Sequence, residues 1–356
     1  MIELAEVFRR HWPAYQAQFG ERIPAAHRRA AQAILACGTP ALGGHRFVCG
    51  DCRKEVFVYH SCNHRACPRC GGRRSSQWLD RQMLKLLPVP YFLITFTVPE
   101  ELRDWFRSQP KVACNLLFRQ ASATLLEVGA NPKHLGAQLG FTAVLHTWTR
   151  QLQYHPHLHL IVPGGGLTSE GCWKQTGNPE FFLPQAVLAA RFRNRLKAAL
   201  RQDHETWRQV PVRVWSKRWV VDCQPAGSGQ NVLKYLACYV GKTALASSRI
   251  LRDDGTHITF SYQDAADKNW KILTVTAQEF LRRFLQHVLP SGLQRVRSYG
   301  FLAPAAKRRW EHIVRLLDYT PVPAPQRVAQ SICCPFCQGH HLILLGELPR
   351  ATLKAA

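Results

Sequence analysis

Two pairs of cysteines in the first quarter of the chain have the spacing of metal ligands. Cys49 and Cys52 form one C-x-x-C pair, and Cys67 and Cys70 form another after fourteen intervening residues. In a four-cysteine zinc ribbon, each pair forms a turn that presents two thiolates to one tetrahedral ion. The spacing therefore predicts that these four residues bind one structural Zn²⁺. Three residues inside the intervening loop could replace one of the four ligands: His60, Cys62 and His64.

A further pair of cysteines lies near the C-terminus, in the segment CCPFCQGHH. Cys334 and Cys337 are expected to form at most a second, weaker metal site, with partners from His340, His341 or elsewhere in the chain. The chain has 13 cysteines, an odd number, and most of them lie in short pairs. This pattern favours metal thiolates in a reducing compartment over a disulfide framework, and it predicts a cytoplasmic protein.

A pair of histidines in the segment HPHLHLIV is the second candidate for metal chemistry. Side chains two residues apart on a strand share one face, so His157 and His159 can chelate one cation while Leu158 faces the core. A metal-free histidine pair and a nucleotide hydrolase with His157 as nucleophile are the alternatives, and Pro156 weakens the latter. A third ligand is expected to be His146, which a hairpin would bring beside the histidine pair, and the alternatives are Gln151 and Gln153.

Two tyrosines form the third candidate site, in the segment KYLACYVGK. A helix is expected over residues 230–246, and on it Tyr235 and Tyr239 would share one face with their side chains about 6 Å apart. Two phenol oxygens placed in this way could serve one active site in turn. The alternative interpretation is an aromatic pair that only packs against the core.

The charge of the chain points to a polyanionic partner. There are 47 Lys and Arg against 23 Asp and Glu, which gives a formal net charge of +24. Such an excess favours binding to nucleic acid, whose phosphates are neutralised by clustered basic residues. The basic residues predicted to contact DNA are Arg73, Arg74, Lys234, Lys242, Arg295 and Arg297.

The elements that must position these residues alternate between helices and strands, which predicts an α+β fold with an antiparallel sheet. Helices are expected over 1–36, 75–87, 100–129, 184–207, 230–246 and 277–288, and strands over 56–60, 91–98, 141–149, 157–162, 210–221, 250–262 (a hairpin) and 270–275. The predicted domains are a helical and zinc-binding domain (1–87), a nuclease domain (88–248), an accessory DNA-binding region (249–325) and a Cys/His tail (326–356). No stretch reaches the roughly 18 apolar residues of a membrane span, and no export signal is evident.

Six segments together resemble the IS91-family transposases, which belong to the HUH endonucleases. The segments are SCNHRACPRC (61–70), FLITFTVP (92–99), HPHLHLIVPGGGL (155–167), KYLACYVGK (234–242), EFLRRFLQHVLP (279–290) and QRVRSYGFL (294–302). The resemblance extends over nearly the whole chain. It implies a ferredoxin-like palm, with the histidine pair on its central strand and the tyrosine helix beside it.

The resemblance also implies a reaction. A divalent ion, Mg²⁺ or Mn²⁺, on the histidines would activate a phosphate of single-stranded DNA, and a tyrosine would form a 5′-phosphotyrosine, as in rolling-circle transposition. The implied partners are the element ends, the target strand, and host replication or helicase machinery in the bacterial nucleoid. Two alternatives are a plasmid replication initiator or relaxase with the same chemistry, and a zinc DNA-binding protein whose histidines and tyrosines are relics.

Overall fold

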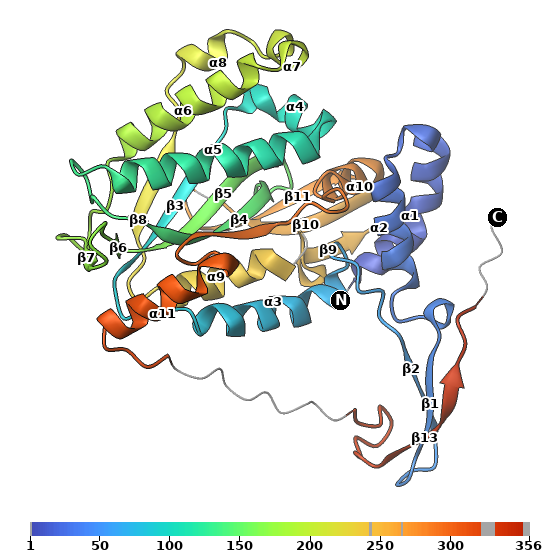
Figure 1. The fold of residues 1–356 in the computed structure, drawn as a ribbon. Helices are drawn as coiled ribbons and strands as arrows, with labels where there is room; N and C mark the ends of the chain where they lie inside the picture. Colours follow the sequence, from blue (N-terminus) through green and yellow to red (C-terminus); the bar gives the residue numbers. More distant parts are fainter. Residues whose placement is uncertain (1, 242–243, 265, 322–331, 352–356) are drawn as a thin grey trace. The chain divides into compact units, whose positions relative to one another are not determined.

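The computed structural model describes residues 2–241, 244–264, 266–321 and 332–351 (Figure 1). The chain forms two compact units, each built from segments that are far apart in the sequence. The first unit contains residues 1–74, 241–288 and 325–356, and the second contains residues 75–240 and 289–324. The linear division expected at residues 87, 248 and 325 differs from this arrangement, because segments late in the chain pack with the N-terminal helices and strands.

A five-stranded antiparallel sheet forms the centre of the second unit. Its strand order is β12-β4-β5-β3-β8, so β5 is the central strand. The strands are β3 (Tyr91–Thr97), β4 (Gly140–Trp148), β5 (Tyr154–Pro163), β8 (Val221–Pro225) and β12 (Val296–Gly300). A short hairpin, β6 (Gly165–Leu167) and β7 (Trp173–Gln175), follows β5. The predicted α+β class with an antiparallel sheet is confirmed.

One face of this sheet is largely apolar. Phe92, Phe96, Leu158 and Leu160 point to this face and are buried. Three helices cover it (Figure 1): α4 (Arg103–Ser108), α5 (Pro110–Ala130) and α6 (Gln185–Arg201). Because β3 and β5 alternate strictly, the residues between these apolar ones must point to the other face.

The opposite face is apolar at one end and carries histidines at the other. Val144 and Ile161 pack there against Leu233 and Leu236 of α9 (Gln230–Gly241). The part of α3 (Pro68–Met83) that belongs to this unit and α11 (Lys307–Leu316) lie on the same side (Figure 1). Along β5 the same face continues from Ile161 to the two histidines, so packing of α9 places a helix beside them.

The strand predicted over residues 210–221 is wrong for most of its length. Two short helices, α7 (His204–Gln209) and α8 (Arg213–Ser216), precede β8, which begins only at Val221. The tryptophans of this region stack on one another, with ring centroids 5.5 Å apart for Trp207 and Trp215 and 5.7 Å apart for Trp215 and Trp219. Tertiary burial of aromatic rings has here overridden their local preference for strands.

The first unit contains the helices α1 (Leu4–Phe19) and α2 (Ala25–Ala36) and two three-stranded sheets, with orders β13-β1-β2 and β11-β10-β9. The strands are β1 (Gly44–Cys49), β2 (Glu55–Tyr59), β9 (Ile250–Asp253), β10 (His257–Gln263), β11 (Trp270–Thr276) and β13 (Leu342–Leu348). Helix α10 (Ala277–Leu285) begins at the residue where a helix was expected, and the Thr276 hydroxyl caps it by accepting a hydrogen bond from the Glu279 backbone N–H. Within the described residues, every helix is too short or too polar to cross a bilayer.

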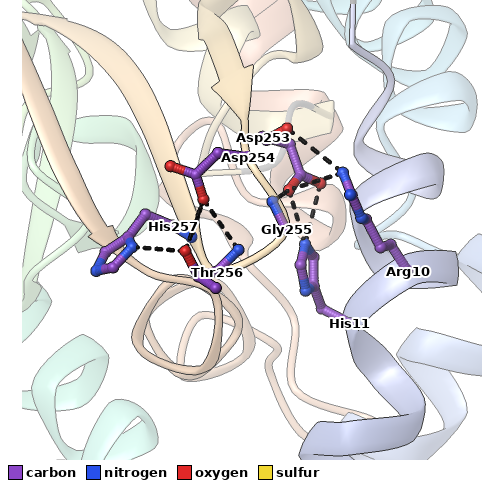
Figure 2. A network of polar contacts seen from close by, with 7 residues as sticks. All are labelled: Arg10, His11, Asp253, Asp254, Gly255, Thr256 and His257. Carbon is purple, nitrogen blue, oxygen red and sulfur yellow. Dashed lines mark hydrogen bonds and ion pairs between the residues drawn. The ribbon is translucent and has the colours of Figure 1, made fainter.

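A buried histidine–aspartate pair joins α1 to the β9–β10 hairpin (Figure 2). His11 Nε2 donates to both carboxylate oxygens of Asp253, at 2.9 and 3.0 Å, and Arg10 adds an ion pair at 3.3 Å. The Asp253 carboxylate also accepts from the backbone N–H of Gly255, whose φ of 97° suits a residue without a side chain. These contacts bring together segments more than 240 residues apart in the sequence.

Asp253→Ala is expected to destabilise the first unit by about 2–3 kcal/mol, because it leaves the buried His11 ring without its charged hydrogen-bond acceptor. Arg10→Ala is the matched control: its side chain is 55% exposed, so its loss should cost less than about 1 kcal/mol. Urea unfolding followed by circular dichroism measures both variants. Equal midpoints for Asp253→Ala and wild type would show that the pair contributes nothing.

Candidate metal centres and active site

Three histidines from β4 and β5 converge on one face of the central sheet. His146 lies directly opposite His157 in the ladder between these strands, and His159 follows on the same face. His146 Nδ1 lies 2.9 Å from His157 Nε2, which lies 3.1 Å from His159 Nε2. Two nitrogens bound at right angles to one ion, with bonds of about 2.1 Å, are about 3.0 Å apart. The spacing of the three nitrogens therefore fits a shared cation.

The hydrogen bonds on the far side of these rings favour the same conclusion. His157 Nδ1 lies 2.7 Å from the backbone oxygen of His155, which can only accept, so Nδ1 carries the proton and Nε2 carries a lone pair. The Thr95 hydroxyl lies 3.0 Å from His159 Nδ1 and can accept a hydrogen bond from it, and in that tautomer His159 Nε2 also carries a lone pair. Two lone pairs that face each other across about 3 Å repel unless a cation lies between them. Metal-binding histidines are typically oriented in this way.

Burial keeps these rings neutral, which is the state that a metal ligand needs. It lowers the pKa of His157 to about 3 and the pKa of His159 to about 4. His146, His157 and His159 are each less than 9% exposed. At neutral pH, protons therefore do not compete with a cation for these nitrogens.

Thr95→Val is expected to weaken the binding of a divalent cation by roughly 10–100-fold, the usual cost of removing a hydrogen-bond partner behind a metal ligand. Calorimetric titration of the protein with Mn²⁺ measures this loss directly. Thr97→Val is the matched control, because Thr97 lies two residues further along the same face of β3. If both variants bound Mn²⁺ as wild type does, the Thr95 hydroxyl would not orient a ligand.

One of the two predicted nucleophiles lies beside this histidine cluster. The Tyr235 ring centroid is 6.2 Å from that of His159, and the Tyr235 side chain is 43% exposed. The burial of Leu233, Leu236 and Ala237 against the sheet fixes the rotation of α9 and leaves Tyr235 on its accessible side. Tyr239 belongs to the same helix, but its side chain lies outside the described residues.

The predicted DNA-binding residues fall into different environments. Arg73, Arg74 and Lys234 are exposed, and Lys242 lies outside the described residues. Arg295 covers the ring of Trp148 at 5.6 Å, and Trp148 in turn contacts the His146 ring at 4.1 Å, so this arginine lies close to the histidine cluster. Arg297 instead packs 4.1 Å above the ring of Phe118 and donates to Asn115 on the apolar side of the sheet. Arg297 therefore packs against α5, on the face of the sheet opposite to the histidines.

A small cavity of about 210 Å³, lined by three basic residues and by Glu100 and Glu101, opens at the histidine end of β3 and β5. His155 lines it and lies 3.0 Å from the guanidinium of Arg103, which donates to His155 Nδ1. Its other basic residues are Lys217 and Arg218, and Lys217 forms an ion pair with Glu101. Sequence reasoning did not single out this cavity, because its lining comes from three separate segments.

The cysteines form two groups of four in the first unit. The first group consists of Cys37, Cys62, Cys67 and Cys70, and the second of Cys49, Cys52, Cys334 and Cys337. In the first group, Cys70 Sγ lies 3.6 Å from the sulfurs of both Cys37 and Cys62. Burial raises the pKa of Cys37 to about 11, so the thiolate that binds a metal forms here only when a cation compensates its charge.

The prediction that Cys49, Cys52, Cys67 and Cys70 share one ion is therefore wrong. The two pairs lie at opposite ends of the β1–β2 hairpin, because Cys49 and Cys52 occupy its turn while Cys67 and Cys70 follow β2. Strand β2 has five residues and, at about 3.3 Å per residue, is about 16 Å long. This length far exceeds the distance of about 3.8 Å between two sulfurs bound to one zinc ion. Cys62, the expected substitute, is a member of the first group, whereas His64 is not.

Cys37 was missed by the sequence reasoning. It lies alone at the end of α2, twelve residues before Cys49, and has no partner cysteine at metal-ligand spacing. The available signal was the number of sulfurs in the segment 37–70, which contains six cysteines, two more than one tetrahedral site can use.

Family profiles and known proteins match this chain over most of its length. Residues 7–98 match the family profile described as a transposase zinc-binding domain, and residues 140–309 match the profile described as "Putative transposase". "Putative transposase y4qJ" of Sinorhizobium fredii (strain NBRC 101917 / NGR234) is 36% identical over 343 residues, which cover 91% of this chain and 86% of that protein. "Transposase for insertion sequence element IS801" of Pseudomonas savastanoi pv. phaseolicola is 28% identical over 285 residues, covering 76% of this chain and 68% of that protein. No solved structure matches the chain significantly.

The two profiles and these relatives identify a DNA-processing enzyme of the transposase class. The chain belongs to the IS91-family transposases. Its zinc-binding domain includes the whole first cysteine group, and four thiolates in tetrahedral spacing are the donors that Zn²⁺ prefers.

Proposed function

We propose that this transposase nicks and rejoins single-stranded DNA through a 5′-phosphotyrosine intermediate during rolling-circle transposition. The observation that carries the proposal is the position of Tyr235 beside the cluster of His146, His157 and His159. In this proposal the second unit is a ferredoxin-like palm of the HUH type, and β5 is its central strand.

In the proposed reaction the three histidines bind the cation and Tyr235 supplies the nucleophile. A divalent cation held by the three histidines, Mg²⁺ or Mn²⁺, would polarise the scissile phosphate. The Tyr235 oxygen attacks the phosphorus and loses its proton, and the bond to the 3′ oxygen breaks, so that a free 3′-OH is released. Because the phosphodiester energy remains in the tyrosine linkage, a 3′-OH can later attack that linkage and rejoin strands without ATP.

The charge around the cluster supports a phosphate-rich substrate. Arg295 lies over Trp148 at one side of the histidines, and Arg103 lines the cavity beside His155. An aromatic ring next to an arginine suits an unpaired nucleotide, which can stack while its phosphate is neutralised. The sequence contains no G-x-x-x-x-G-K-[ST] loop, so host helicase or replication machinery would open the duplex.

A plasmid replication initiator or relaxase could use the same histidines and tyrosine. The zinc-binding domain and the transposase relatives favour the transposase. A zinc DNA-binding protein with relic residues is disfavoured, because the three histidines are spaced as ligands and Tyr235 lies accessible beside them.

Incubation of the protein with single-stranded oligonucleotides from the flanks of its own gene, with Mg²⁺ or Mn²⁺, tests the proposal. A covalent protein–DNA adduct that maps to Tyr235 or Tyr239 by mass spectrometry is expected. The same oligonucleotides annealed into duplexes, and reactions with a chelator, should give no adduct. Cleavage without any covalent intermediate would refute the tyrosine mechanism.

A further inference from the structure

The second cysteine group joins two segments from opposite ends of the chain. Cys49 Sγ lies 3.6 Å from Cys337 Sγ, and Cys52 Sγ lies 3.6 Å from Cys334 Sγ. All four sulfurs lie within 4.8 Å of one another. A disulfide requires about 2.05 Å, whereas two sulfurs of a tetrahedral zinc site, with Zn–S bonds of about 2.3 Å, lie about 3.8 Å apart. The sulfur spacing is that of a metal site.

The two C-x-x-C turns that contribute these sulfurs have the same backbone conformation. In each turn the N–H after the second cysteine donates to the carbonyl of the first: Arg53 to Cys49 and Gln338 to Cys334, both at 2.9 Å. Arg53 and Gln338 both have positive φ, 59° and 62°, which side-chain-bearing residues adopt at a cost. Two matched turns that face each other with all four sulfurs inward form a ligand set rather than a chance cluster.

Hydrophobic burial does not explain why the tail, residues 332–351, stays on this sheet. The buried residues of the hydrophobic cluster at this sheet are Cys49, Val56 and Cys334, and two of these three are proposed ligands. Strand β13 pairs with β1 from Gly44 to Cys49, yet Leu344 and Leu345 of β13 are half exposed. So small a hydrophobic core needs a further interaction to hold the tail on the sheet. In many small domains a structural metal ion provides that interaction.

We propose that Cys49, Cys52, Cys334 and Cys337 bind a second Zn²⁺, which fixes the C-terminal tail to the N-terminal zinc-binding domain. The family profile for that domain ends at residue 98 and so contains only two of these four ligands. The tail is thus a component of the zinc module and not an appendage. The inference does not depend on the histidine site, so either proposal can fail alone.

Zinc counting on the full-length protein tests this inference. Native mass spectrometry and elemental analysis should give two Zn²⁺ per chain that remain in the His157→Ala/His159→Ala variant, so that zinc bound at the histidine cluster is not counted. The double variant Cys334→Ser/Cys337→Ser should retain one, and so should Cys67→Ser/Cys70→Ser. The matched control is Cys333→Ser, because Cys333 is adjacent to Cys334 in sequence but is not a member of either group; this variant should retain two.

A second measurement needs no variant. Removal of zinc from the wild-type protein by a chelator should accelerate amide hydrogen exchange in residues 342–348 at least tenfold, because β13 loses its attachment. One Zn²⁺ in the wild-type chain, two in the Cys334→Ser/Cys337→Ser variant, or iron in place of zinc would overturn the assignment. Unchanged exchange in β13 after zinc removal would overturn the proposed attachment of the tail.

Discussion

His157→Ala is expected to reduce single-strand cleavage by a factor on the order of 10³ or more. His157 Nε2 is the central nitrogen of the cluster, 2.9 Å from His146 Nδ1 and 3.1 Å from His159 Nε2, so its removal disrupts every pairwise contact in the ligand set. A catalytic cation supplies several kcal/mol of transition-state stabilisation, and each tenfold change in rate corresponds to about 1.4 kcal/mol. Single-turnover cleavage of a labelled oligonucleotide measures the loss, and His159→Ala should behave in the same way.

Binding of the oligonucleotide should change little in these variants. Affinity for single-stranded DNA depends on many phosphate contacts and should fall steeply with salt in wild type and variants alike, which fluorescence anisotropy can follow. The control is His204→Ala, because His204 is an exposed histidine at the start of α7. Wild-type cleavage by either His157→Ala or His159→Ala would show that the histidines do not hold the catalytic ion.

The double variant Tyr235→Phe/Tyr239→Phe is expected to form no covalent adduct, with a loss on the order of 10⁴-fold or more, as for removal of other enzymatic nucleophiles. Phenylalanine keeps the ring that packs near His159 and removes only the attacking oxygen. Each single variant separates the roles of the two phenols. If each tyrosine holds one DNA end, both single variants should still cleave an oligonucleotide but fail in transposition, which requires two successive cleavages.

Adduct formation is measured on denaturing gels, and transposition is measured by a mating-out or excision assay. Tyr319→Phe, remote from the α9 sequence, serves as the control for the loss of a phenol. A double variant that still forms the adduct would exclude both tyrosines. A single variant with full transposition activity would reduce the pair to one nucleophile, and we expect Tyr235 to be that residue because it lies beside the histidines.

The histidine site shows how far local patterns reach. Alternation along β5 predicts that His157 and His159 share a face, and the choice of His146 as their companion follows from pairing two adjacent strands. The register that sets His146 opposite His157 comes from the pairing of β4 with β5. The hydrogen bonds of His159 with Thr95 and of His157 with the His155 carbonyl also depend on the folded sheet. Strand β3, which carries Thr95, is separated from β5 by more than fifty residues of sequence, so no local spacing reveals that contact.

The cysteine sites show where local patterns fail. The residue types and their spacing were enough to predict metal-binding cysteines, a basic surface and an α+β fold, and to show a resemblance to the IS91 family. Spacing along the chain measures proximity only when the intervening residues form a loop, and here the strand β2 carries Cys67 and Cys70 away from Cys49 and Cys52. That Cys37 completes one group, and Cys334 and Cys337 the other, is visible only in the folded chain. The reason is that antiparallel pairing of β13 with β1 brings a late segment of the chain beside an early one.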